Sequence, residues 1–195
     1  MKKLIVLVLV LSMATIANAG LQISVGGQIN PPDTQISLLP SETVMIDIHG
    51  DGTTPGPYSL FLLTKGAGNM SGGGIVMSPI LAISEFTWHN NDVFTQMLTT
   101  NGFATTNAVY VNAVSALTPI PNYEGRIVDD IVFHCDAVGE VTLMLIHLDQ
   151  VENPDTGDME NVWTTLDTQV IHQIPEPMTM VLLGLGGLFL RRRSK

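Results

Sequence analysis

The fold is decided by residues 126–148, which read RIVDDIVFHC (126–135), DAVG (136–139) and EVTLMLIHL (140–148). Apolar residues at alternating positions give the first segment one face that can be buried, formed by Ile127, Ile131, Phe133 and Cys135. Asp129 in the same segment needs solvent or a partner. The third segment is apolar on both faces, as expected for a central strand that is covered on both sides. Because the four residues between them have the length of a hairpin connection, the pattern predicts two paired strands.

Outward from this pair, seven more short apolar or alternating segments are bounded by Gly, Pro or Asn residues, as strands are. These segments are residues 21–25, 35–39, 43–48, 58–63, 75–83, 108–114 and 162–172. About nine short strands without alternating helices predict a mainly β fold, and an antiparallel β-sandwich rather than a parallel α/β sheet.

Two stretches depart from the strand pattern. Residues 91–99 place apolar side chains at helical spacing, so a short helix or turn is expected, with Asn90 or Asn91 available as its cap. Residues 64–74 contain five glycines and are predicted to form a mobile loop.

Composition excludes several classes of protein. The chain has 195 residues, a formal charge of −10, 45% hydrophobic residues and one cysteine. A disordered acidic tail would be poorer in apolar residues, and a disulfide scaffold would need several cysteines. The length fits about one globular domain between two terminal signals.

The amino terminus has the features of an export signal. Lys2 and Lys3 precede an apolar run over residues 4–11, and the segment closes with Ala17 and Ala19 around a polar residue, as signal peptidase requires. We expect residues 1–19 to be a signal peptide and Gly20 to begin the mature chain. The alternative is a buried N-terminal helix or strand. The residue directly after the cleavage site is not a cysteine, which excludes lipoprotein anchoring.

The carboxyl terminus has a second signal. Pro175-Glu176-Pro177 precedes an apolar segment over residues 178–190, which is followed by Arg191, Arg192 and Arg193. As a helix this segment spans about 20 Å, and snorkelling arginines extend its reach toward the roughly 30 Å hydrocarbon core of a bilayer. The positive-inside rule keeps the arginines cytoplasmic, which leaves the body outside.

These three elements, in this order at the end of the chain, resemble the PEP-CTERM protein-sorting signal of Gram-negative bacteria. The resemblance implies that Pro175, Glu176 and Pro177 are the recognition motif within residues 175–195. It implies transient anchoring in the inner membrane, removal of the tail by an exosortase, and association with the cell surface or extracellular polysaccharide. The alternative is a simple tail anchor.

The body, residues 20–174, carries 17 acidic residues and only two basic ones, Lys65 and Arg126, for a net charge of −15. Such a surface repels nucleic acid, anionic lipid and acidic polysaccharide unless divalent cations bridge them. We therefore expect no nucleic-acid partner.

Two pieces of the body resemble a cohesin-like β-sandwich of the jelly-roll kind. Residues 37–48 contain an early strand, a Pro-Ser-Glu turn and a strand that ends in Asp-Ile. Residues 125–148 contain a hydrophobic-x-Phe-x-Cys strand, a Gly turn and a Val-Thr-Leu strand. The resemblance implies a fold, and it carries over no partner-binding residues.

The densest acidic cluster suggests a candidate calcium site. Its proposed ligands are Asp149, Glu152, Asp155 and Asp158. Closely spaced carboxylates on a Gly/Pro loop can supply the oxygen ligands that Ca²⁺ takes, but the EF-hand spacing is not met. A solvated turn explains the same residues, and both interpretations stay open.

Other candidates for chemistry are weaker. Asp47 and His49 share a strand face but lack a third member, and His134 and His147 would face each other on paired strands. Cys135 suits a buried apolar position, because the adjacent His134 points to the opposite face. Ser71 sits in a Gly-rich loop without a Gly-x-Ser-x-Gly motif. The aromatic residues could form a sugar-stacking platform or pack in the core: Tyr58, Trp88, Tyr110, Tyr123 and Trp163.

The two terminal signals predict an exported surface or matrix protein. Because no acid–base pair or triad can be assembled from the sequence, we expect this protein to be non-catalytic and to need no cofactor. One alternative is a calcium-assisted carbohydrate- or protein-binding module. A second alternative is an extracellular hydrolase.

Overall fold

The computed structural model describes residues 20–32, 36–55, 58–76, 81–115, 122–154 and 157–175. The predicted signal peptide and the sorting segment from Glu176 onward lie outside these residues. Within the described ranges, no helix has the length and apolar character needed to cross a membrane.

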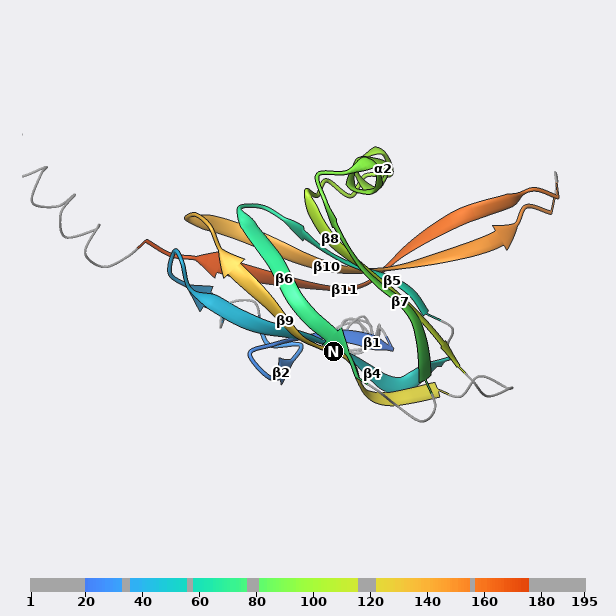
Figure 1. The fold of residues 1–195 in the computed structure, drawn as a ribbon, viewed down its shortest axis with the longest axis horizontal. Coiled ribbons are helices and arrows are strands. Elements are labelled where there is room, and N and C mark those ends of the chain that lie inside the picture. Colours follow the sequence, from blue (N-terminus) through green and yellow to red (C-terminus); the bar gives the residue numbers. More distant parts are fainter. Residues whose placement is uncertain are drawn as a thin grey trace, which may run out of the picture.

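The described chain forms two β-sheets and one short helix (Figure 1). The elements are β1 (Leu21–Val25), β2 (Gln28–Ile29), β3 (Ser37–Leu38), β4 (Thr43–Pro55), β5 (Tyr58–Lys65), β6 (Gly68–Ile75), β7 (Leu81–Asn90), α2 (Val93–Thr100), β8 (Asn107–Ser115), β9 (Asn122–Cys135), β10 (Gly139–Glu152) and β11 (Met159–Gln173). One sheet has the order β2-β1-β4-β9-β6, and the other has the order β3-β11-β10-β5-β8-β7. All strand pairs in the described ranges are antiparallel except β3 with β11. The prediction of a mainly β, two-sheet antiparallel fold is confirmed.

The main core lies between the two sheets. Ile46 and Phe133 come from the five-stranded sheet, and Leu60 and Leu143 come from the six-stranded sheet, all fully buried in one cluster. The four residues predicted to share a face of β9 all belong to this cluster. Apolar burial from both sheets is what holds them together.

A second cluster covers the outer face of the six-stranded sheet. Phe61 and Ile146 point away from the main core and pack with Leu98 of α2. Because β10 contributes Leu143 to one cluster and Ile146 to the other, the prediction that this strand is covered on both sides is confirmed.

The predicted β9–β10 hairpin is wrong. β9 pairs with β4 and β6, whereas β10 lies between β11 and β5 in the other sheet. Residues 136–139 therefore cross from one sheet to the other. The backbone N–H of Asp136 donates to the carbonyl of Ala67 (3.3 Å), which extends the pairing of β6 with β9 by one residue before the chain crosses. His134 and His147 consequently lie in different sheets and do not face each other on paired strands.

Two local expectations also need correction. Residues 64–74 are not a loop, because β6 begins at Gly68 and pairs with β9. Phe133 fills the space beside Gly68, where an added Cβ would lie 2.3 Å from the phenyl Cζ. The predicted helix is present, but its N-cap is Asp92, whose Oδ1 accepts from the N–H groups of Phe94 (3.0 Å) and Thr95 (2.9 Å).

Candidate functional site

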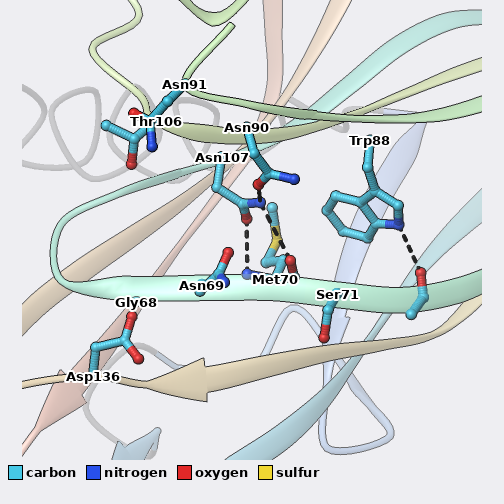
Figure 2. A pocket seen from close by; sticks show the side chains of 11 residues that line it. Gly68, Asn69, Met70, Ser71, Trp88, Asn90, Asn91, Thr106, Asn107 and Asp136 are labelled. Atoms are coloured by element: carbon cyan, nitrogen blue, oxygen red, sulfur yellow. Dashed lines mark hydrogen bonds between the residues drawn. The ribbon is translucent and has the colours of Figure 1, made fainter.

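A polar groove of about 510 Å³ lies at an edge of the sandwich (Figure 2). β6 is the edge strand of one sheet and β7 is the edge strand of the other, and the groove lies between them, with the start of β8 at its base. The polar or aromatic side chains that line it include Asn69, Ser71, Trp88, Asn91, Thr106 and Asn107.

Asn107 joins the two sheets across the base of the groove. Its Oδ1 accepts from the backbone N–H of Met70 (2.7 Å), and its Nδ2 donates to the Met70 carbonyl (3.3 Å). The same Nδ2 also donates to Asn90 Oδ1. Figure 2 shows Asn90 and Asn107 pointing toward β6. Since Asn107 is 3% exposed, its amide is a fixed part of the structure.

Trp88 makes a second link from β7 to β6. Its indole Nε1–H donates to the carbonyl of Gly72 (3.0 Å), and its ring meets Phe86 edge-on. The side chain is half-buried, and it also lines the groove. Trp88 therefore combines an anchored edge with a partly accessible aromatic surface.

The groove carries little charge. Of the residues that line it, only Asp136 is ionisable, and its Oδ1 lies 2.8 Å from His134 Nδ1. The two basic residues of the body, Lys65 and Arg126, are not among the lining residues. The site offers amides, hydroxyls and an aromatic ring rather than an ion.

The groove contains two of the sequence candidates, Ser71 and Trp88. Two other aromatic candidates lie elsewhere: Tyr110 and Trp163 pack against Phe61 on the outer face of the six-stranded sheet, with ring centroids 4.8 and 5.6 Å away. Asn107 was not identified from sequence. An Asn directly before an apolar strand is a turn signal, and its role in bridging the sheets follows only from the topology.

The acidic candidates lie on the β10–β11 hairpin, whose far end extends beyond the rest of the sandwich in Figure 1. Asp149, Glu152 and Asp158 are exposed, and Asp155 lies outside the described residues. Backbone bonds close the turn: Asn153 N–H donates to the Asp158 carbonyl (2.8 Å). The described ranges contain no group of three His, Cys, Asp or Glu side chains that could hold a metal. The calcium site stays a prediction.

Asp47 and His49 do approach each other, with 4.0 Å between Oδ2 and Nε2. Asp47 is 7% exposed, and its Oδ1 accepts from the N–H of Asp130 (3.1 Å), a residue with a φ of 57°. Burial lowers the pKa of His49; Asp47 opposes this effect and Arg126 adds to it. The Asp47 carboxylate therefore stabilises the left-handed backbone of β9 at Asp130, which is a structural role.

Cys135 is fully buried, as predicted. Burial raises the pKa of its thiol, so the reactive thiolate is disfavoured. Its Sγ lies 3.6 Å from the carbonyl oxygen of Ala137.

No family model and no curated protein matches this chain. Among solved structures, the chain is similar to a cohesin module from Clostridium perfringens ATCC13124 family 33 glycoside hydrolase, with 11% sequence identity and a TM-score of 0.35. The match covers 80% of this chain and 98% of that one.

Proposed function

We propose that this chain is an exported, non-catalytic β-sandwich protein, processed at both ends and held at the cell surface or in the extracellular matrix. Its processing enzymes would be signal peptidase and exosortase. Its role outside the cell would be binding rather than catalysis.

The observation that carries this proposal is where the strands lie relative to the two signals. The carbonyl of Gly20 already accepts a sheet hydrogen bond from Asp51 N–H (2.9 Å), directly after the predicted cleavage site. At the other end, β11 stops at Gln173, two residues before Pro175. Cleavage at both sites would therefore leave every described strand in place.

The candidate nucleophiles support a non-catalytic role. Ser71 lies in a groove whose lining residues include no histidine, and Cys135 is buried with a raised pKa. A nucleophile needs a base within hydrogen-bond reach and access to substrate.

Mass spectrometry of the protein recovered from its own culture medium tests the processing. We expect the loss of residues 1–19 and of the tail near Pro175. A Glu176→Gln variant should keep its tail, whereas Glu160→Gln on the hairpin should be processed normally. If the tail is retained in the unmodified protein, or if the source genome encodes no exosortase, the sorting proposal fails and a tail anchor remains.

The acidic hairpin favours a second candidate, a binding module that uses calcium. Asp149, Glu152 and Asp158 are exposed carboxylates on this hairpin, and Asp155 lies between the last two in the sequence. Millimolar Ca²⁺ should then raise the melting temperature, and an Asp155→Asn/Asp158→Asn variant should lose the shift while Glu85→Gln keeps it. An unchanged melting temperature in Ca²⁺ would remove this candidate.

A further inference from the structure

We propose that the groove between β6 and β7 binds an uncharged polysaccharide chain. The inference rests on the proposed binding role and adds to it a site and a class of ligand. Its support comes from five features: a fixed base, polar side chains on the rim that make no internal hydrogen bond, an aromatic surface, little charge, and a second hollow that shares the rim.

The base of the groove is rigid before any ligand arrives. Asn107 bonds both polar backbone groups of Met70, and Trp88 bonds the carbonyl of Gly72, so the spacing between β6 and the opposite sheet is fixed. Asn107 and Met70 are 3% and 2% exposed. A preformed site saves the free energy of ordering on binding.

The rim of the groove carries polar groups that the fold does not use. Within the described ranges, the side chains of Asn69, Asn91 and Thr106 make no hydrogen bond, and all three are exposed. Each amide offers two donors and an acceptor, and the hydroxyl both donates and accepts. This mixed set matches the hydroxyl groups of a sugar, which also donate and accept.

Trp88 supplies the apolar complement. A pyranose ring has faces of C–H groups and an edge of hydroxyls, so it suits a site with one aromatic surface and several amides. In Figure 2 the Trp88 ring lies on the same side of β6 as the side chains of Asn90 and Asn107. Aromatic rings combined with a few polar groups are typical of ligand sites of this size.

Other ligand classes fit less well. A peptide that added a strand to β6 would need the outward-facing groups of Met70 and Gly72, and Asn107 and Trp88 already occupy three of them. An anionic ligand would meet no basic side chain in the groove and a body charge of −15. A metal ion would find Asp136 as the groove's only carboxylate.

The groove continues into a second hollow of about 420 Å³ along α2, and both are lined by Asn91 and Thr106. The backbone N–H of Asn91 donates to the Thr106 carbonyl (2.9 Å), so this shared rim is held in place. The residues that line the second hollow carry no charge, and they include Gln96 and several threonines of α2. A ligand with repeated sugar units would contact both hollows, so affinity should rise with chain length.

The test is a glycan array of neutral and anionic glycans probed with the full-length chain, followed by calorimetry with the best neutral glycan at increasing lengths. The test variant is Asn69→Ala/Thr106→Ala, which removes two exposed side chains and no internal bond. The matched control is Gln28→Ala/Thr164→Ala, an exposed amide on β2 and an exposed hydroxyl on β11 whose side chains also make no hydrogen bond within the described ranges. Circular dichroism shows whether each variant is folded.

We expect at least one neutral glycan to bind, with affinity reduced about tenfold or more in the groove variant and unchanged in the control. An Asn91→Gly variant, which keeps the left-handed backbone at this position, should also bind less tightly. The proposal is overturned if no neutral glycan binds, if only anionic glycans bind, or if the groove variants bind as well as the control. Mass spectrometry of the processed ends does not depend on this result, so the two proposals can fail separately.

Discussion

The side-chain amide of Asn107 on β8 pairs with the backbone of Met70 on β6, much as a neighbouring strand would. It accepts from the Met70 N–H (2.7 Å) and donates to the Met70 carbonyl (3.3 Å). β6 and β8 belong to different sheets, so one amide satisfies an edge strand and closes the sandwich there. Edge strands leave unpaired backbone groups, and this pairing blocks further association at Met70.

Replacing Asn107 with alanine should destabilise the fold strongly. The change leaves the buried N–H of Met70 without its partner, and we expect a loss of about 1–3 kcal/mol in the free energy of unfolding. Urea unfolding followed by circular dichroism measures this loss. Asn161→Ala, at an exposed position on β11, should stay within about 0.5 kcal/mol of the unmodified protein. Equal effects of the two substitutions would show that the Asn107–Met70 pairing contributes little.

The glycines of β6 differ in what lies beside them, which gives a matched pair of substitutions. An added Cβ at Gly68 would lie 2.3 Å from Phe133 Cζ, and that ring is fully buried and cannot retreat. At Gly74 the nearest atom would be 3.9 Å away. Gly68→Ala should therefore cost about 1–3 kcal/mol and Gly74→Ala almost nothing, as judged by urea unfolding. The reverse order would contradict this packing arrangement.

The strands could be predicted from residues 126–148 and their surroundings, but the partner of each strand could not. Alternation correctly identified the buried face of β9, and two-sided apolarity correctly identified β10 as central. The four residues between them suit a hairpin or a crossing between sheets equally well, because local sequence does not record which edge each strand will pair with. The glycines of β6 were misleading for a related reason: Gly68 leaves room for Phe133, a residue far away in the sequence.

The groove was only partly predictable. Trp88 and Ser71 were recognised as chemically interesting residues, but nothing in their spacing places them beside Asn107. That placement depends on two sheets meeting edge to edge, which is a long-range property of the fold. Asn69 and Asn91 similarly acquire significance only once β6 and β7 are known to be edge strands.

Asp92 should make the stability of α2 depend on pH in the acid range. Its hydrogen bond from the N–H of Thr95, together with the interaction with His89, holds the pKa of Asp92 below its ordinary value. The charged form is thus stabilised by folding, and its contribution is complete above about pH 4 and is lost as the pH falls through the lowered pKa.

An Asp92→Asn variant isolates this charge, because asparagine can still accept from the cap N–H groups. The unmodified protein should melt at a higher temperature than the variant near pH 7, and the two should converge as the pH falls toward 2. Thermal unfolding by circular dichroism over this range measures the difference. A difference that stays constant with pH would mean that the cap acts without its charge.

His49 should make stability fall as the pH drops below neutrality. Burial lowers the pKa of His49 in the folded protein, so below the ordinary histidine pKa of about 6.5 the unfolded chain takes up a proton before the folded chain does. Unfolding is therefore favoured as the pH falls from that value to the lowered pKa. The slope for this one group is at most about 1.4 kcal/mol per pH unit.

A His49→Gln variant removes the titrating group and keeps a polar side chain beside Asp47. Urea unfolding from pH 8 to pH 5 should show the unmodified protein losing stability relative to the variant as the pH falls, with the curves parallel above pH 7. Proton NMR of the His49 ring in the folded protein should give a midpoint below 6.5. A stability difference that does not change with pH would contradict the effect of burial on the His49 pKa. A slope of the opposite sign would mean that Asp47, which raises this pKa, outweighs burial.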